Sequence, residues 1–419
     1  MTISCRVCGG TDLEAVLDLG SQPHCNSLLS LEELALPEPV YPLQLLFCRE
    51  CTTVQIDYTV PKETMFSDYL YLTGSTQSLC RHFRDSAQRL RDRLELQQGD
   101  LVVDIGSNDG TWLKYFNELG MDGLGVEPAH NVAVLAEAAG VPTLVRFFNR
   151  EVSSEILEAF GTPRLVTAAG VFFHLEELHS VAAGIAEFCR RGAVFCVQAI
   201  YLAEMVRQNA FDNIYHEHLT YWTLRSLEAL LRQHGLEVFD AAVLPIHGGS
   251  LELLIGSEGR WPVHASVEEL RRREAIEGMG EAATYHDFAA RVRDVGCRLT
   301  GLLEEYAAAG LRVQAFGAPA KGATMLNSLQ ITSRLIEAAV EVNPLKIGRY
   351  MPGACIPIVA EGALPEPDAY LVLPWNFLGS FLEKKRDYII GGGRFIVPIP
   401  EPAVIDKSNY ASWAMLSNV

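Results

Sequence analysis

Residues 211–222 read FDNIYHEHLTYW and place His216, Glu217 and His218 in a row, directly after Tyr215. Histidine ionises near neutral pH, so an imidazole beside a carboxylate suits the removal of a proton from a substrate. The same side chains could instead form a buried hydrogen-bond cluster that only holds a loop. The segment therefore predicts either a catalytic base with supporting groups or a structural cluster.

The elements that must position this segment belong to a globular chain of more than one domain. With 419 residues, the chain exceeds what one hydrophobic core usually covers, so two or three domains are expected. Its 49% of hydrophobic and 21% of charged residues are typical of a folded protein. The net charge of −18 argues against a nucleic-acid partner, because a phosphate backbone requires a surface rich in Lys and Arg.

The first ten residues, MTISCRVCGG, lack the basic flank and the apolar run of a signal peptide. No apolar stretch reaches the roughly 18 residues that a membrane-spanning helix needs. We therefore expect a soluble, cytoplasmic protein with no membrane partner, and we expect it to be a monomer.

Four of the ten cysteines form two CxxC pairs, in CRVC and CREC. These four are Cys5, Cys8, Cys48 and Cys51. Each pair can present two thiolates from a tight turn, and four thiolates complete a structural zinc site. Redox pairs or a chance spacing are the alternative. We predict a structural Zn²⁺ and a zinc-binding domain over residues 1–72 that depends on it for folding, with Cys25 as a small buried hydrophobe.

A strand, a glycine-rich turn and a helix are predicted within residues 99–120, GDLVVDIGSNDGTWLKYFNELG. LVVDI has the continuous apolar pattern of a buried strand, and the helix that follows the turn ends at Gly120. Such a turn lets backbone N–H groups approach a ligand, as in dinucleotide-binding folds. An ordinary βαβ unit with a structural acid is the alternative.

The turn is not GxGxxG, and its pattern DIGxxxG resembles that of S-adenosylmethionine-dependent methyltransferases. The resemblance implies that Asp104 and Gly106 approach the amino acid part of the cofactor. It also implies that Glu127, at the end of the next strand, accepts the ribose hydroxyls. The cofactor-binding residues implied in this way are Asp104, Gly106, Asn108, Gly110 and Glu127. We therefore predict a Rossmann-like S-adenosylmethionine-binding domain over residues 73–260.

Two further strands are predicted within residues 164–175 and 192–202, each of which carries a run of buried-strand residues. His174 lies just past the end of the first of them. Ligands collect at the carboxyl ends of the strands in an open α/β sheet, so His174 and residues 215–218 are expected to meet over the cofactor. For His174 alone, a histidine satisfied within the core is the alternative.

Residues 261–419 begin with charged helices, expected to bridge the domains, and then repeat the order of strand, glycine-rich turn and helix. The alternation predicts a second parallel sheet and hence a C-terminal Rossmann-like domain. No acid stands at a convincing ribose position in it, so a second adenosine cofactor is not expected. Lys321, in the turn FGAPAKGA, and also Lys346 and Arg349 could meet substrate phosphates or lie on a solvated surface.

Taken in order, these motifs resemble the C-methyltransferases of deoxysugar biosynthesis over nearly the whole chain. The motifs are CRVCGG, QPHCNSLL, FCREC, DIGSNDGTWL, FFHLEEL, IYHEHLTYW, IHGGSLELLI, FGAPAKGATMLN and FIVPIPEP. The two CxxC pairs and YHEH with the later HGGS are the most specific of them. The resemblance implies an N-terminal zinc domain, a central cofactor domain and a C-terminal Rossmann-like domain around a cleft for a nucleotide-linked 4-keto sugar, expected to be dTDP-linked.

The resemblance also implies roles for the site residues. The general base falls on His218, with Tyr215, Glu217 and His174 beside it, and a contact to the nucleotide-sugar falls on Tyr71. Removal of the acidic hydrogen beside the C4 ketone would leave an enolate whose carbon attacks the sulfonium methyl, and no catalytic metal is required. Tyr215 or His174 could donate to the enolate oxygen, while Glu217 could orient an imidazole or hold the sugar.

The chain departs from the family pattern in two places beside the expected pocket. Relatives usually have an asparagine where this chain has Gly170, and an acid and a proline within the run Gln198, Ala199 and Ile200. The departures allow a different sugar, a different methylated carbon or a weakened enzyme. Methylation at C3 is expected over C5. An O- or N-methyltransferase and a non-catalytic nucleotide-sugar-binding protein are the competing functions.

Overall fold

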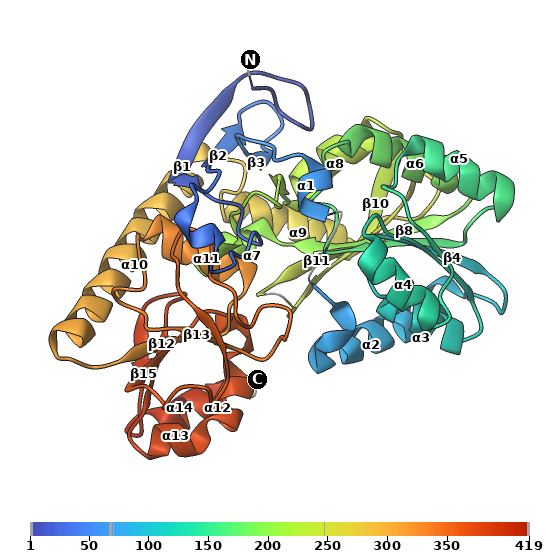
Figure 1. Cartoon of the computed structure of the whole chain (residues 1–419). Coiled ribbons are helices and arrows are strands. Elements are labelled where there is room, and N and C mark those ends of the chain that lie inside the picture. Colours follow the sequence, from blue (N-terminus) through green and yellow to red (C-terminus); the bar gives the residue numbers. More distant parts are fainter. Residues whose placement is uncertain (1–2, 67–68, 70, 247, 417–419) are drawn as a thin grey trace.

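The computed structural model describes residues 3–66, 69, 71–246 and 248–416, and these residues form three sheets with their helices (Figure 1). His247, which belongs to the HGGS motif, lies outside the described residues. Among the described residues, no helix combines the length and the apolar character needed to cross a membrane.

The N-terminal sheet is antiparallel, and its fourth strand comes from far along the chain. Its strands, in spatial order, are β1 (Leu13–Gln22), β2 (Tyr41–Cys48), β3 (Val54–Ile56) and β9 (Thr220–Tyr221). β9 pairs with β3 through Val54 opposite Tyr221 and Gln55 opposite Thr220. The end of the segment 211–222 is thus part of the N-terminal sheet. The domain limits predicted from the sequence stay a prediction, and this sheet extends beyond residues 1–72.

The middle sheet has the strand order β10-β11-β8-β7-β4-β5-β6. Its strands are β4 (Leu101–Ile105), β5 (Asp122–Val126), β6 (Thr143–Leu144), β7 (Leu165–Ala169), β8 (Val194–Ile200), β10 (Leu236–Leu244) and β11 (Ser250–Ser257). β4 to β8 are parallel, and β11 is antiparallel to β8 and β10. The chain order reverses between β4 and β7, so the carboxyl ends of these strands form the crevice where ligands bind in such sheets.

Helices cover both faces of the middle sheet. They are α2 (Gln77–Leu94), α3 (Thr111–Glu118), α4 (His130–Ala138), α5 (Arg150–Ala159), α6 (Leu178–Arg190), α7 (Leu202–Arg207) and α8 (Leu224–Arg232). In α2, Leu79, Phe83 and Leu90 recur at helical spacing and are buried. Val102 lies in the hydrophobic cluster of α2 and α3, whereas Val103 lies in that of α5 and α6. Successive residues of β4 therefore serve opposite layers, as in a doubly wound fold.

The C-terminal sheet repeats this plan with the order β14-β13-β12-β15-β16-β17. Its strands are β12 (Val313–Phe316), β13 (Ala339–Glu341), β14 (Ile358–Ala360), β15 (Ala369–Val372), β16 (Arg394–Val397) and β17 (Ala403–Ile405). Only β17 is antiparallel to its neighbour. The predicted fold class, α/β with an N-terminal zinc-binding module and two Rossmann-like sheets, is confirmed.

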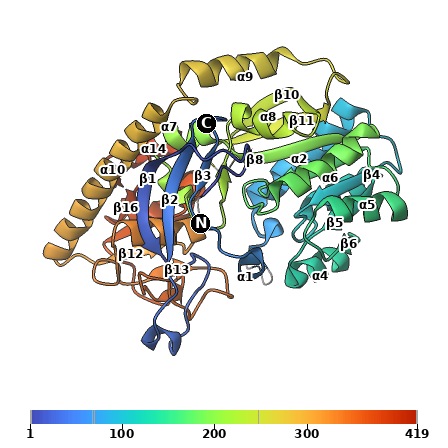
Figure 2. The same cartoon turned by 90° about the horizontal axis from the view of Figure 1, so that it is seen from above.

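One long helix packs against two of the three sheets. Helix α10 (Ala282–Ala308) contacts both β1 and β12, and Figure 2 shows it along one side of the molecule. The remaining helices are α1 (Lys62–Phe66), α9 (Ala265–Ile276), α11 (Ala320–Ser328), α12 (Leu378–Lys384), α13 (Arg386–Ile390) and α14 (Tyr410–Leu416), with short 3₁₀ turns at Glu33–Ala35, Thr73–Ser75, Phe211–Asn213 and Trp375–Phe377. Of the charged helices that were expected to bridge the domains, α10 makes these contacts.

Candidate functional site

A pocket of about 910 Å³ is lined by residues from all three parts of the chain. Its volume lies near the upper end of the range of roughly 300 to 1,000 Å³ for small-molecule sites, so it has room for more than one ligand group. The predicted site residues that line it are Tyr71, Gly106, Asn108, Glu127, His174, Tyr215, Glu217, His218 and Lys321. Most of the residues singled out in the sequence therefore meet at one place.

Glu127 follows β5 directly and is 5% exposed. The backbone N–H of Asn108 donates to its Oε2, and that of Ala129 donates to its Oε1, each at 2.9 Å. Burial raises the pKa of this carboxyl, while the two N–H groups act in the opposite direction. Each oxygen keeps a second lone pair, so the carboxylate is positioned to accept two neighbouring hydroxyls such as those of ribose.

The turn after β4 depends on unusual backbone conformations. Gly106 has φ +69°, and a Cβ there would come within 2.4 Å of the side chain of Val171. Asn108, at φ +50°, accepts from the N–H of Thr73 and donates to the carbonyl of Tyr71, both at 3.0 Å. The side chain of Asn108 therefore ties the Tyr71 segment to the cofactor side of the pocket, and Tyr71 itself is half exposed at the rim.

Asp104 and Gly110 lie behind the pocket wall. The Asp104 carboxyl accepts from the hydroxyl of Thr167 at 2.7 Å and is 4% exposed. Burial raises its pKa to about 7, against the effect of the Thr167 hydrogen bond. Gly110 precedes α3 at φ +73° and faces Val141. Both residues shape the turn, and the direct contacts to the pocket come from their neighbours.

His218 is buried, and its tautomer is set by its surroundings. Its Nδ1 lies 2.8 Å from the carbonyl oxygen of Asn213. A carbonyl only accepts, so Nδ1 carries the proton and the lone pair of the neutral ring lies on Nε2. The ring centroids of Tyr215 and Phe173 lie 3.9 and 4.3 Å from that of His218. The imidazole thus packs against two aromatic rings, and its accepting nitrogen is Nε2.

His174 lies in the turn after β7, which ends at Ala169 and so is shorter than the predicted strand. Its Nδ1 donates to the backbone carbonyl of Glu217 at 2.5 Å. Burial lowers the pKa of His174, and Glu217 only partly offsets this effect, so the ring is neutral at pH 7. Its Nε2 therefore carries a lone pair and cannot donate a hydrogen bond. The ring centroids of His174 and His218 are 5.0 Å apart.

Glu217 faces the N-terminal module. Its Oε1 accepts from Nδ2 of Asn26 at 2.5 Å and lies 3.2 Å from Nε2 of His24. Burial acts to raise the pKa of this carboxyl, but the contacts with His24 and Asn26 and the nearby His174 outweigh it and lower the pKa. The carboxylate of Glu217 thus lies beside the imidazole of His24, while its backbone carbonyl accepts from His174. Sequence reasoning missed His24 and Asn26, although both stand in the QPHCNSLL motif.

Lys321 lies where its charge is already compensated. Its Nζ donates to Asn376 at 2.7 Å and lies 3.6 Å from the fully buried carboxyl of Asp212, which also accepts from the indole N–H of Trp375 at 2.8 Å. The ammonium also stands over the Trp375 ring. This pair joins residues 211–222 to α11 of the C-terminal unit, and Lys321 lines the pocket.

The sequence showed no acid in the C-terminal half that corresponds to Glu127, but the structure places Glu341 at such a strand end. Glu341 is the last residue of β13, the strand next to β12, and it lines the pocket. Backbone N–H groups of Ala318, Val342 and Asn343 donate to its carboxylate at 3.1, 2.8 and 3.1 Å. The acid was missed because the stretch VEVNP did not reveal where the short strand ends.

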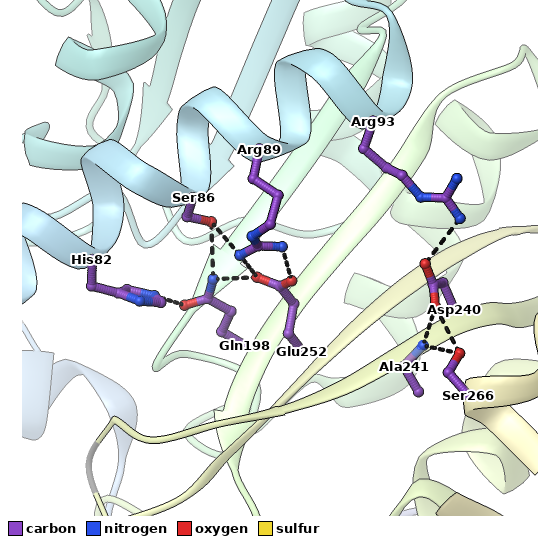
Figure 3. Close-up of polar contacts among 9 residues, drawn as sticks. All are labelled: His82, Ser86, Arg89, Arg93, Gln198, Asp240, Ala241, Glu252 and Ser266. Carbon is purple, nitrogen blue, oxygen red and sulfur yellow. Dashed lines mark hydrogen bonds and ion pairs between the residues drawn. The ribbon is translucent and has the colours of Figure 1, made fainter. Parts of the chain in front are cut away.

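The departure at Gln198 is matched by a polar network that fixes α2 to the sheet (Figure 3). The side-chain oxygen of Gln198 accepts from His82 at 2.9 Å, and its side-chain nitrogen donates to Glu252 at 2.8 Å. Glu252 in turn pairs with Arg89 of α2. A carboxylate at position 198 would stand against that of Glu252, so glutamine suits this chain. Ala199 and Ile200, the other two departures in this run, are the last residues of β8 and also line the pocket.

The departure at Gly170 leaves open space. Gly170 lines the pocket just after β7, with φ +70° and its N–H bonded to the carbonyl of Gln198 at 2.9 Å. A Cβ built there meets no described atom within 4 Å. This stretch of the wall is therefore wider than one that carries a side chain at this position.

The four thiols of the two CxxC pairs come together. Their sulfurs all lie within 4.8 Å of one another, with 3.4 Å between Cys5 and Cys51 and 3.6 Å between Cys8 and Cys48. A zinc tetrahedron with bonds of about 2.3 Å has edges of about 3.8 Å, so the cluster fits this ion. The hydroxyl of Thr53 lies 3.1 Å from the sulfur of Cys51 and adds outer support.

Three family models match the chain in the order of its sheets. They are a zinc binding domain over residues 5–66, a methyltransferase domain over residues 80–241 and a C-methyltransferase C-terminal domain over residues 245–400. The cysteine cluster and the first match support zinc, and the middle fold and second match support S-adenosylmethionine as cofactor.

Similar proteins include the C-methyltransferase NovU of Streptomyces niveus, which is 35% identical over 408 residues, with 97% of each chain covered. Among solved structures, magnesium protoporphyrin IX methyltransferase of Synechocystis with bound S-adenosylmethionine is 11% identical, with a TM-score of 0.31 over 42% of this chain and 79% of that chain. A methyltransferase of Clostridium acetobutylicum is 11% identical, with a TM-score of 0.35 over 43% and 92%. Because its similarity to NovU extends over nearly the whole of both chains and three domain models match, the chain belongs to the family of S-adenosylmethionine-dependent C-methyltransferases.

Proposed function

We propose that the protein methylates C3 of a nucleotide-linked 4-keto deoxysugar, carried on dTDP, and that His218 is the base. The observation that carries this proposal is the set tautomer of His218, with an accepting Nε2 in a pocket shared by the cofactor side and the C-terminal sheet. Carbon bound to hydrogen is no nucleophile, so C-methylation requires a positioned base. A buried, oriented imidazole meets that requirement.

The residues on the cofactor side of the pocket bind and orient S-adenosylmethionine. Glu127 accepts the ribose hydroxyls, and Gly106 lets the backbone of the turn approach the ligand. When bound, S-adenosylmethionine supplies a methyl group on a sulfonium, which a carbon nucleophile can take. Asn108 holds the segment of Tyr71 over this side of the pocket, where the phenol can contact the nucleotide-sugar.

The choice of the hydrogen-bond donor to the ketone follows from the tautomers. His218 and His174 both use Nδ1–H for a backbone carbonyl, so in the neutral state neither offers a donor on Nε2. Tyr215 lines the same pocket, and burial raises the pKa of its phenol well above the usual value, so the hydroxyl keeps its proton. We assign Tyr215 as the donor that stabilises the enolate oxygen.

Structural zinc belongs to the same proposal. The four thiolates of Cys5, Cys8, Cys48 and Cys51 fill a tetrahedron and leave no place for substrate. The folded module presents Asn26 to Glu217 and pairs with β9, which follows the base in the chain. The zinc therefore acts on the reaction through the position of the pocket wall.

Reaction of the purified protein with S-adenosylmethionine and a dTDP-linked 4-keto deoxysugar tests the proposal. A product heavier by one methylene, with the new methyl on C3 by nuclear magnetic resonance, is the expected result. A methyl on C5, on oxygen or on nitrogen would assign one of the competing functions. Absence of product with this sugar, together with turnover of a substrate without a ketone, would reject the enolate route.

A further inference from the structure

Glu341 in the C-terminal sheet is held in the manner of Glu127 in the middle sheet. Glu127 follows β5 and takes one N–H from the turn after β4 and one from two residues onward in the chain. Glu341 ends β13 and takes one N–H from Ala318, in the turn after β12, and two from the residues that follow it. In both cases the turn donates to Oε2 and the following residues donate to Oε1.

The strands beneath the two acids correspond as well. β4 and β5 are parallel neighbours at the point where the chain order of the middle sheet reverses, and β12 and β13 hold the same place in the C-terminal sheet. In Rossmann folds the acid after the second strand accepts hydroxyls of a nucleotide pentose. The same geometry in both sheets predicts the same class of ligand group at both acids.

Both acids line one pocket, so the two pentose positions serve one reaction. The amino end of α11 borders the pocket beside the turn that contacts Glu341, and helix amino ends suit phosphate groups. Lys346 donates to the carbonyl of Ala318 at 2.9 Å and adds positive charge to this wall. The charge of Lys321, in contrast, is compensated by Asp212.

We propose that Glu341 binds the pentose of the nucleotide part of the substrate through its 3′-hydroxyl, the one free hydroxyl of the deoxyribose in dTDP. The assignment of that nucleotide to a sugar substrate rests on the proposed function, whereas the pentose site itself rests on the cradle around Glu341. The C-terminal sheet then anchors the nucleotide, and the middle sheet anchors the cofactor ribose. The reacting sugar extends from the first anchor toward His218.

Titration calorimetry on the full chain tests the pentose site with a pair of matched variants. The probes are S-adenosylhomocysteine, thymidine diphosphate and uridine diphosphate. Glu341→Gln should weaken the binding of the diphosphates roughly 10-fold or more, because a charged acceptor is lost, and should leave S-adenosylhomocysteine within twofold. Glu127→Gln should show the opposite pattern. Each variant is thus the folding control for the other.

The outcome is separable from that of the proposed function, because none of the three probes carries a keto sugar. Diphosphate affinity that is unchanged in Glu341→Gln, with normal cofactor-product binding, would overturn the inference. Wild-type protein that binds neither diphosphate would overturn it as well. If Glu341→Gln weakens both probe classes equally, the shorter Glu341→Asp variant decides: selective loss of diphosphate binding supports the pentose site, and equal loss assigns Glu341 a structural role.

Discussion

His218 donates Nδ1–H to the backbone carbonyl of Asn213 at 2.8 Å, so a main-chain group orients the imidazole. The neighbouring residue Asp212 is fully buried and is bound by Trp375 and Lys321 of the C-terminal half. The loop that orients His218 is therefore held by residues of the C-terminal half. On its other side, Glu217 is held by Asn26 of the zinc module. Contacts from the zinc module and from the C-terminal half thus hold the chain on both sides of His218.

Asp212→Ala should strongly destabilise the protein. The change leaves the ammonium of Lys321, whose side chain is 15% exposed, without its counter-ion. Loss of one partner from a buried pair typically costs about 3 to 5 kcal/mol. We expect a large fall in the melting temperature, with partial recovery in the double variant Asp212→Ala, Lys321→Met. Equal melting temperatures of wild type and Asp212→Ala would show that the pair contributes nothing.

Asn26→Ala should lower turnover through the position of Glu217. The variant removes the 2.5 Å hydrogen bond to Glu217 and keeps the two N–H donors of Glu127. We expect kcat/KM for the sugar to fall by roughly 10-fold, since a hydrogen bond to a charged group is lost, with S-adenosylhomocysteine affinity unchanged. Asn26→Asp, which places a second carboxylate there, should be worse. Unchanged kcat/KM in both variants would show that Asn26 does not position Glu217 for the reaction.

The purified protein should carry one zinc per chain. Metal analysis of the native protein and of Cys48→Ser tests this, and the variant should lose the ion because a buried ligand of the four is missing. Methylation should fall with the zinc content, since the N-terminal sheet includes β9. Native protein that contains no zinc and four titratable thiols would contradict the prediction.

Asp104 should make stability depend on pH. Burial raises its pKa to about 7 in the folded protein, while an exposed aspartate ionises near 3.9. Between these values the folded state keeps a proton that the unfolded state has released, so stability falls as the pH rises through this window. Asp104→Asn can keep the bond with Thr167 and has no such cost.

The gain in melting temperature of Asp104→Asn over wild type should therefore be larger at pH 8 than at pH 5. Thermal scans of both proteins at the two values measure it. A difference that is the same at both values would show that Asp104 ionises at its ordinary pKa. Weaker binding of S-adenosylhomocysteine to the variant would add the cofactor role that the sequence motif implies.

Local signals in the sequence predicted much of the fold. The apolar run before Gly106 and the helical pattern that ends at Gly120 are properties of short segments, and they correspond to β4 and α3. The strand predicted within residues 164–175 was expected to end just before His174, but β7 ends at Ala169 because Gly170 at φ +70° leaves the extended conformation. Apolar side chains on both sides of Gly170 hide this break from a pattern based on hydrophobicity.

Long-range partners were the part that the sequence could not reveal. Asn26 and Glu217 are 191 residues apart, and the pairing of β9 with β3 is one of the tertiary contacts that bring the two segments together. The compensation of Lys321 by Asp212 is likewise a tertiary contact. Glu341 could have been predicted from the sequence, because it follows the turn at Gly317 as Glu127 follows the turn at Gly106. The number of residues between turn and acid differs in the two halves, and this difference hid the correspondence.

His218→Asn is the variant that isolates the base. An asparagine can still donate to the carbonyl of Asn213, so the fold and the affinity for S-adenosylhomocysteine should be kept. Methyl transfer should fall by roughly 100-fold or more, the usual contribution of a positioned proton acceptor. A variant that instead loses its melting temperature and its substrate binding, with activity in proportion to the folded fraction, would mean that the cluster only holds a loop.

The most direct test is deuterium exchange into the 4-keto sugar in heavy water, with S-adenosylhomocysteine in the cofactor site so that no methyl can be transferred. The wild-type protein should exchange the hydrogen on C3, and His218→Asn should do so at least about 100-fold more slowly. Exchange by His218→Asn at the wild-type rate would contradict the central claim and would move the base to another residue of the pocket.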